Sequence, residues 1–200
     1  MKKITIVALL SVCVATQALA DNADTFYVAV DRGQASFSNA MVSINSTVAA
    51  PNPGAMRIAG GYNINSMFAV EAGYVKFGDS TYITTVSGVG SANETLSSSS
   101  FQVAAVGIYP INAKFSLFGK LGFANNKINY SYIDTLGGTN NGSGAKTDVM
   151  YGIGGQYNIN SNWGIRVQYE DFGKTQVSCI NCTRENIGLS MLSIGGVYTF

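Results

Sequence analysis

The stretch Tyr157–Phe172, YNINSNWGIRVQYEDF, combines a polar turn with a strand of strict two-residue periodicity. After the turn at 158–162, one set of alternate residues is apolar and comprises Trp163, Ile165, Val167 and Tyr169. The intervening set comprises Gly164, Arg166, Gln168 and Glu170. Successive side chains of a strand point to opposite faces, so this pattern predicts a strand with one apolar and one polar face.

Two earlier stretches repeat this turn and strand. YNINSMFAVEAGY begins at Tyr62, 95 residues before Tyr157, and a weaker copy, YPINAKFSLFGKL, begins at Tyr109. The copies are therefore spaced by 47 and 48 residues. Three related hairpins at nearly equal spacing require one architecture that uses the same unit repeatedly.

Residues 1–20 have the pattern of a cleaved signal peptide. Lys2 and Lys3 precede an apolar run at 4–14, and Ala18-Leu19-Ala20 matches an A-x-A cleavage site. The run is too short to span a bilayer as a helix. Cys13 raises the alternative of a lipoprotein, but the preceding Val12 stands where a small residue is expected, so we assign Cys13 to the leader. We expect residues 21–200 to form one domain.

The composition of the expected mature chain favours a membrane barrel. Loss of Lys2 and Lys3 leaves 10 basic and 11 acidic residues, without a basic cluster, so nucleic acid is not an expected partner. Only 12% of the residues are charged, whereas there are 23 Gly, 11 Tyr and 10 Phe. A secreted chain that is rich in Gly and aromatic residues, and alternates with period two, fits a transmembrane β-barrel.

The alternation predicts eight strands joined by three short turns and four long loops. The first six strands are expected at about 25–34, 56–63, 67–77, 96–109, 115–125 and 147–158, the seventh is the opening stretch, and the eighth ends at Phe200. The long loops are expected at 35–55, 78–95, 126–146 and 173–186. Short turns on one side and long loops on the other are typical of outer-membrane barrels, and closure leaves no unpaired edge in lipid. The predicted fold class is therefore all-β, an eight-stranded antiparallel transmembrane up-and-down barrel.

A secreted β-sandwich is the alternative fold, because it also has alternating strands. Here the polar faces consist mostly of Gly, Ala, Ser and Gln, which favours the narrow, filled interior of a small barrel. Aromatic residues also gather beside the predicted turns, as expected of a girdle at one membrane interface: Tyr62, Phe68, Tyr109, Phe115, Tyr157 and Trp163.

The end of the chain, SIGGVYTF, resembles the signal by which the outer-membrane assembly machinery recognises barrels. The matching residues are Ser193, Gly195, Tyr198 and Phe200. Over residues 21–200 the chain resembles the small OmpA-like family, which includes opacity-type porin-family proteins. The segments that carry this resemblance are FYVAV, FSLFGKLGFA, YGIGGQYNI, WGIRVQYEDF and SIGGVYTF. The resemblance implies the Gram-negative outer membrane as the location, with its lipid and the assembly machinery as partners.

Charged residues are predicted on the lumen face of the barrel. They are Arg57, Glu71, Lys120, Arg166 and Glu170, with Asp31 nearby. An eight-stranded barrel is just wide enough for side chains, so these charges must be paired or hydrated. We favour a salt-bridge network that plugs the barrel; the alternative is a gate for a narrow pore.

The sequence does not predict catalytic or metal chemistry. The chain contains no His, whereas barrel enzymes of the outer membrane resemble one another in using a His as general base. There is no phosphate loop, no metal cluster and no cofactor motif. Cys179 and Cys182 form a CxxC motif in the fourth loop. A redox motif requires a helix N-terminus in a thioredoxin context, which the sequence does not predict here. A zinc site requires four ligands, and no others are close in the sequence. We therefore favour a loop disulfide formed in an oxidising compartment.

These observations predict a small outer-membrane protein with a structural or surface-interaction role. Loops on a rigid scaffold are where recognition is expected, so a host or surface ligand would bind the four long loops. The alternative function is a narrow pore for ions or small solutes.

Overall fold

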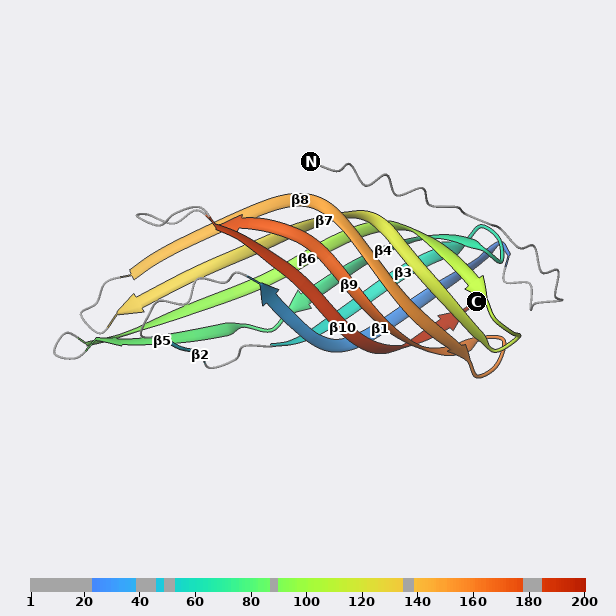
Figure 1. Ribbon diagram of the computed structural model, residues 1–200, viewed down its shortest axis with the longest axis horizontal. Helices are drawn as coiled ribbons and strands as arrows, with labels where there is room; N and C mark the ends of the chain where they lie inside the picture. The colour runs from blue at the N-terminus through green and yellow to red at the C-terminus, as the bar shows by residue number, and fades with distance from the viewer. Residues whose placement is uncertain (1–22, 39–45, 49–52, 87–89, 135–138, 178–184) are drawn as a thin grey trace, which may run out of the picture.

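The computed structural model describes residues 23–38, 46–48, 53–86, 90–134, 139–177 and 185–200, and these residues form a slanted, closed β-barrel (Figure 1). Its strands are β1 (Thr25–Ser38), β2 (Ser46–Val48), β3 (Gly54–Asn63), β4 (Phe68–Phe77), β5 (Ser80–Val86), β6 (Gly90–Pro110), β7 (Phe115–Asp134), β8 (Thr139–Asn158), β9 (Trp163–Val177) and β10 (Glu185–Thr199). No helix among the described residues is long and apolar enough to cross a membrane.

Eight of these strands close the barrel, in the order β6-β4-β3-β1-β10-β9-β8-β7, and β7 pairs again with β6. All these pairings are antiparallel. The first and last barrel strands meet along a ladder that runs from Tyr27↔Thr199 to Ser38↔Gly188. The predicted eight-stranded antiparallel barrel is thus confirmed.

The three short turns are built in the same way, as their repeated sequence predicts. In each turn an Asn carboxamide oxygen accepts two backbone N–H groups, at 2.8–3.0 Å. The three residues are Asn65, Asn112 and Asn160. We call this side of the barrel the turn end, and the opposite side the loop end; the C-terminus lies at the turn end (Figure 1).

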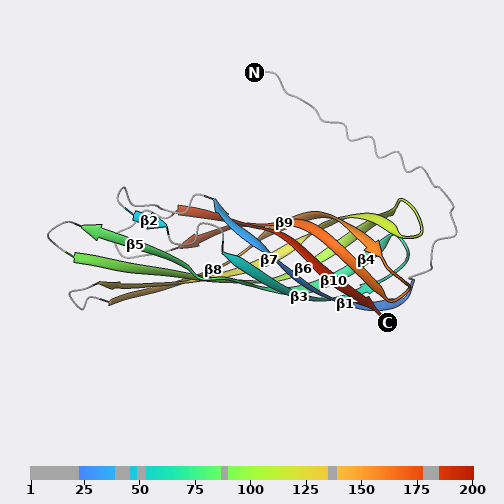
Figure 2. The same cartoon turned by 90° about the horizontal axis from the view of Figure 1, so that it is seen from below.

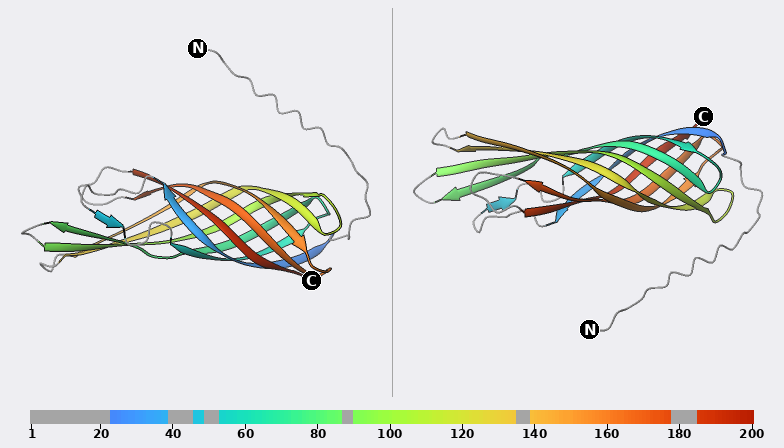
Figure 3. Two further views of the ribbon diagram at one scale, coloured as in Figure 1. Left: turned by 60° about the horizontal axis from the view of Figure 1, so that its bottom comes forward. Right: turned by 90° about the horizontal axis from the view of Figure 1, so that it is seen from above.

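The strands at the loop end are longer than the sequence predicted. The expected loop at 78–95 contains β5 and the first part of β6, and the expected loop at 126–146 contains long parts of β7 and β8. The loop expected at 35–55 includes β2 and the ends of β1 and β3, and β9 and β10 also extend beyond their predicted bounds. The reason is that main-chain pairing continues where the apolar alternation stops. Figures 2 and 3 show the hairpins β5–β6 and β7–β8 projecting from the barrel.

The outer face of the barrel carries the apolar side chains. Several residues on this face are each at least 60% exposed, for example Phe26, Ile58, Leu121 and Ile153. Exposure of such apolar side chains to water would be unfavourable, whereas in a bilayer they contact the hydrocarbon of the lipid. The predicted girdle residues lie on this face beside the turns, where the Trp163 ring also meets Tyr198 at a centroid distance of 4.9 Å.

The lumen contains two apolar layers separated by charged side chains. Near the turn end lie small residues with Tyr27, Val106 and Phe118. Near the loop end lie large side chains that are fully buried, which we call the apolar plug: Phe77, Ile128, Met150, Phe172, Leu189 and Met191. The expectation of an interior filled mainly by Gly, Ala, Ser and Gln was therefore wrong for this half of the lumen.

Candidate functional site

The charged side chains of the lumen form one buried cluster between the two apolar layers. Six charged residues contribute from β1, β3, β4, β7 and β9, and we call them the charge network: Asp31, Arg57, Glu71, Lys120, Arg166 and Glu170. Each of these side chains is at most 3% exposed. Three carboxylates face three cations, so the formal charge of the cluster is zero.

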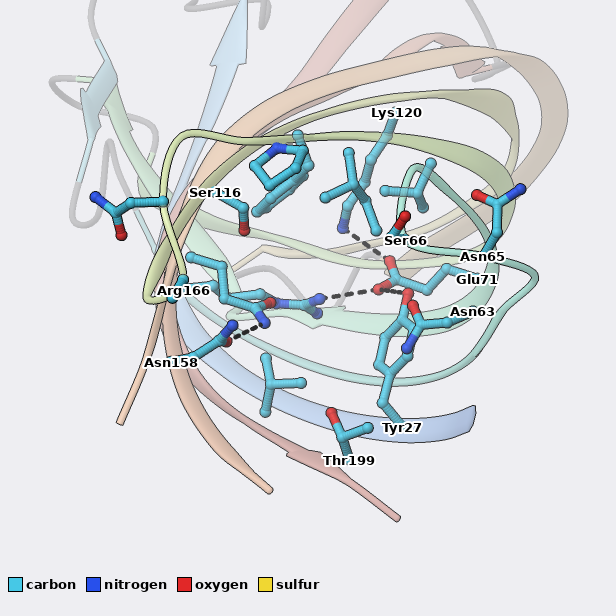
Figure 4. Close-up of a pocket in the computed structure, with 18 residues that line it drawn as sticks. Tyr27, Asn63, Asn65, Ser66, Glu71, Ser116, Lys120, Asn158, Arg166 and Thr199 are labelled. Carbon is cyan, nitrogen blue, oxygen red and sulfur yellow. Dashed lines mark hydrogen bonds and ion pairs between the residues drawn. The ribbon is translucent and has the colours of Figure 1, made fainter. Parts of the chain in front are cut away.

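Glu71 is the centre of the charge network. Its Oε1 atom accepts a hydrogen bond from Lys120 Nζ at 2.7 Å, and the Arg57 guanidinium also donates to it. Its Oε2 atom accepts from Arg166 Nη1 at 2.9 Å and from the Tyr27 hydroxyl at 3.0 Å. Four donors from four strands therefore converge on one carboxylate, as the dashed lines in Figure 4 show in part.

Asp31 forms a second bridge, between the two arginines. Arg166 donates from Nε to Oδ1 and from Nη2 to Oδ2, each at 3.0 Å, which is the planar two-point contact that a guanidinium makes with a carboxylate. Arg57 Nη1 donates to the Oδ2 atom of Asp31 at 2.7 Å. The sequence placed Asp31 only near the network, whereas the structure places it at its core.

Glu170 completes the network on the side of the apolar plug. Its carboxylate lies 3.1 Å from Lys120 Nζ and 3.4 Å from Arg57 Nε. Gln168 links the same groups, because its Oε1 atom accepts from Lys120 at 2.7 Å and its Nε2 atom donates to Glu170 at 3.3 Å. Each charge thus has at least two partners, which is the condition for tolerating buried ions.

A cavity of about 90 Å³ lies between the charge network and the turns. Its inner wall includes Tyr27, Glu71, Lys120 and Arg166, and its outer wall is rich in amides and hydroxyls from the turn end, as Figure 4 shows. A space of this size holds a few water molecules. On the other side of the network the apolar plug packs tightly, with Phe77 and Phe172 edge to face at a centroid distance of 5.6 Å.

The structure brings together all five lumen residues named from the sequence. Sequence reasoning placed Gln168 on the polar face but did not name it as a partner of the charges, and it missed Tyr27 and the apolar plug as parts of the same interior. The signal was available, because Phe77 and Phe172 continue the inward alternation that begins at Glu71 and Arg166. Residues 1–20, with their predicted cleavage site, and Cys179 and Cys182 lie outside the described residues.

The residues of the predicted assembly signal occupy the last strand, β10. Ser193 is buried in the lumen, and Tyr198 makes edge-to-face contacts with Trp163 and with Phe200, at a centroid distance of 5.1 Å from the Phe200 ring. Gly195 has a packing requirement of its own, because a Cβ atom there would overlap the carboxylate of Asp31 and the Val30 carbonyl. Glycine at this position therefore lets the charge network approach the barrel wall.

The arrangement can hold strands together and exclude bulk water, and it carries no obvious reacting group. Among the described residues, no group of three or more Cys, Asp or Glu side chains is placed to hold a metal ion. Every carboxylate of the network is engaged by cations, so none is a free base.

Comparisons with solved structures show the same fold in small outer-membrane barrels. Ail, the attachment invasion locus protein of Yersinia pestis, in complex with the heparin analogue sucrose octasulfate, is 18% identical, with a TM-score of 0.57 over 89% of this chain and 99% of that chain. Neisserial surface protein A is 17% identical, with a TM-score of 0.51 over 88% and 97%. OprG from Pseudomonas aeruginosa is 11% identical, with a TM-score of 0.52 over 89% and 96%. Comparison with curated proteins gives no match.

The family relationship rests on nearly the whole sequence. The family model described as "Outer membrane protein beta-barrel domain" matches residues 4–200. This match, together with the closed eight-stranded barrel and the apolar outer face, confirms the resemblance to small outer-membrane barrels that the sequence motifs indicated. The chain therefore belongs to the outer membrane protein β-barrel domain family and is an integral protein of the Gram-negative outer membrane.

Proposed function

We propose that this protein acts at the cell surface, with the barrel as a membrane anchor and the loop end as an interaction surface. The observation that carries the proposal is the extension of β5, β6, β7 and β8 beyond the apolar belt. On the outer face of β7, Leu121 and Phe123 are followed by Lys127 and Asn129, so the strand leaves the hydrocarbon between these pairs. In this family the long connections face outside the cell, so the projecting sheet is available to external partners.

The closed lumen supports an anchoring role for the barrel. A neutral charge network, in which every charge is paired, and the apolar plug occupy the interior in series, and a cavity of about 90 Å³ lies beside the network at the turn end. The chain also has no His to act as a general base, so the proposal includes no catalytic activity, cofactor or metal. Ail was crystallised with a heparin analogue, which is a precedent for a ligand on a barrel of this fold.

The test is adherence of bacteria that display the protein. Cells expressing the wild-type chain should adhere to cultured epithelial cells or to immobilised heparin more than cells expressing a variant whose hairpins β5–β6 and β7–β8 are shortened to the edge of the apolar belt. Heat-dependent gel migration of both proteins verifies that the barrels fold. Equal adherence of the two strains to both surfaces would contradict the proposal.

A narrow pore is the second candidate, because the cavity at the turn end reaches Lys120 and Arg166. If the plug and the network close the lumen, purified protein in planar bilayers should be electrically silent. A wild-type conductance that shifts on Lys120→Gln or Arg166→Gln would instead support the pore.

The proposal also covers processing and oxidation of the chain. We infer removal of residues 1–20 and a disulfide between Cys179 and Cys182, because an exported chain folds in an oxidising compartment. Intact mass measurement of protein from outer membranes, before and after reduction, tests both. A mass that retains the leader, or that is unchanged by reduction, would contradict them.

A further inference from the structure

The outer wall of the barrel has a hollow in the half of the apolar belt that adjoins the turn end. Its volume is about 410 Å³, and its floor lies at Gly60 on β3 and Ala72 on β4, which pair in the ladder. Val28 on β1 borders the floor beside Gly60, and Val103 on β6 borders it beside Ala72. The hollow is therefore two strands wide, about 10 Å.

The hollow exists because two adjacent outward positions carry almost no side chain. A Cβ atom built at Gly60 would meet nothing within 4 Å, and Ala72 adds only a methyl group. Toward the turn end, the next outward residues after Gly60 and Val28 are Tyr62 and Phe26, which also line the hollow. Their rings lie against each other at a centroid distance of 4.9 Å. These two rings form an aromatic rim between the hollow and the turn end.

One carboxylate is fixed beside the aromatic rim. The Tyr62 hydroxyl donates a hydrogen bond to Asp24 Oδ1 at 2.9 Å. Asp24 has a φ of 56°, in the left-handed region that few residues other than glycine adopt. Residues 23–28 and 60–72 include no Lys or Arg, and their other acid, Glu71, lies in the lumen. The described surface beside the hollow therefore carries a negative charge without a neighbouring cation on the same segments.

These two features define the chemistry of an occupant. The hollow lies within the apolar belt, so it is filled by hydrocarbon, which gains dispersion contacts with the exposed valine side chains around the floor. The carboxylate of Asp24 repels a headgroup whose only charge is a phosphate and attracts one that also carries an ammonium group. A primary ammonium can donate a hydrogen bond to that carboxylate and lie against the face of the Tyr62 ring.

We propose that the hollow binds one phosphatidylethanolamine molecule of the periplasmic leaflet. Its acyl chains lie over Gly60 and Ala72, and its ammonium group contacts Asp24 beside the Tyr62 ring. The short turns of this family face the periplasm, so the hollow opens to the leaflet that adjoins them. This inference goes beyond the surface-interaction function proposed above, because it concerns the opposite end of the barrel and a different ligand.

A second copy of the chain fits the hollow less well than a lipid does. The outer wall of a barrel is convex, so a neighbouring barrel could fill a space two strands wide only with single side chains. Flexible acyl chains adapt to such a space. The acid at the rim also favours the lipid, because the described cation on the surface of the turn end, Lys114, lies in the turn between β6 and β7 and not beside Asp24.

The test is retention of lipid by the refolded protein, measured by native mass spectrometry after reconstitution with equal amounts of phosphatidylethanolamine and phosphatidylglycerol. We expect one retained phosphatidylethanolamine, preferred over phosphatidylglycerol by about threefold to fivefold, as expected of a contact with an exposed charge. Phosphatidylcholine, whose quaternary ammonium cannot donate a hydrogen bond, should be retained less than phosphatidylethanolamine. Absence of a retained lipid, or equal retention of the three lipids, would overturn the proposal.

Two glycines of the outer wall form a matched pair of variants. Gly60→Leu fills the hollow and should lower lipid retention at least about tenfold. Gly196→Leu adds the same side chain to the belt at a site outside the hollow, where a Cβ atom also meets nothing within 4 Å, and should retain lipid as the wild type does. Equal retention by the two variants would identify annular lipid only and overturn the proposal. A phosphatidylethanolamine with a photoreactive acyl chain tests the wild-type protein directly: it should label residues 58–62 and 70–74, and labelling spread evenly around the belt would also overturn the proposal.

A substitution of the acid tests the headgroup separately from the acyl chains. Asp24→Asn keeps an acceptor for the Tyr62 hydroxyl but removes the charge, so it should abolish the preference for phosphatidylethanolamine over phosphatidylglycerol. Asp79→Asn, at an exposed acid near the loop end, is the control and should leave the preference unchanged. A preference that survives Asp24→Asn would overturn the assignment of the headgroup. A dimer of the purified protein that Gly60→Leu dissociates would identify a second copy as the occupant and overturn the choice of a lipid.

Discussion

Replacement of Glu71 should destabilise the barrel more than replacement of any exposed acid. In Glu71→Gln the side chain keeps its shape, but three buried cations then face two carboxylates, Asp31 and Glu170. Removing one partner of a buried ion pair costs about 3–5 kcal/mol, because the remaining charge is left without compensation. Glu71 lines the adjoining cavity, which has room for water molecules that could solvate the unpaired cations, so we expect the lower part of this range, about 3 kcal/mol. Glu71→Ala also removes methylene groups and should cost at least as much.

The assay is equilibrium unfolding of the refolded protein in detergent. Trp163 is the one tryptophan of the chain and packs against Tyr198 on the outer face. Its fluorescence therefore reports unfolding of the barrel, and the reporter lies outside the lumen where the substitution is made. Asp79→Asn is the matched control, since Asp79 is an exposed acid that accepts a hydrogen bond from Ser97, and it should change stability by less than about 0.5 kcal/mol.

The result that would refute this reasoning is a small effect at Glu71. If Glu71→Gln and Asp79→Asn shift the unfolding free energy equally, then the four donors around Glu71 do not depend on its charge. A double-mutant cycle with Arg166→Gln localises the effect, because residues in direct contact should be coupled by at least about 0.5 kcal/mol. Additive losses would show that the 2.9 Å contact between them contributes nothing specific.

Three further changes test other parts of the structure. Gly195→Ala would overlap the Asp31 carboxylate and should destabilise by about 1–3 kcal/mol, whereas at Gly196 a Cβ meets nothing within 4 Å and alanine should be tolerated; heat-dependent gel migration of the two variants compares them. Asn160→Ala removes the acceptor of two turn N–H groups and should lower stability by about 1 kcal/mol in urea unfolding, as should the same change at Asn65 or Asn112. Phe172→Ala should cost about 3–5 kcal/mol in the same assay, because the plug cannot collapse within a closed barrel wall.

The barrel could be predicted from the sequence because lipid imposes a simple rule on its outer face. Every second residue between the interfaces must be apolar, so strands such as Trp163–Tyr169 are visible without any alignment. This rule does not apply to the parts of the strands that extend beyond the lipid. The upper parts of β6, β7 and β8 pair through main-chain groups with Ser, Thr and Asn side chains, and composition alone cannot separate these strands from a polar loop.

The lumen was only partly predictable for a related reason. Charged residues are rare in this chain, so an Arg or Glu on the inward face of a strand is noticeable, and Glu71 and Arg166 were identified in this way. Inward apolar residues such as Phe172 are less noticeable, because an apolar side chain is expected on the outer face as well. Only the alternation continued from Arg166 along the same strand assigns Phe172 to the lumen.

The repeated hairpin explains how the charge network comes together. Glu71 and Arg166 both lie nine residues after the Tyr that begins their copies of the template, so each stands at the same height above its turn. In the strand order, β4 and β9 are separated by three strands on either path around the barrel, and they therefore face each other across the lumen. Equivalent positions on opposite strands meet at the axis, and two identical charges there would repel. Glu71 and Arg166 have opposite charges, and they form a contact of 2.9 Å at this place.

In the third copy of the template, on β7, the equivalent residue is the uncharged Phe118, whose ring covers Gly154 on the neighbouring strand. Lys120, two residues further, joins the network instead. The backbone of the hairpin is conserved between copies because the turn and the lipid demand it, and the lumen residues differ because each must complement the others.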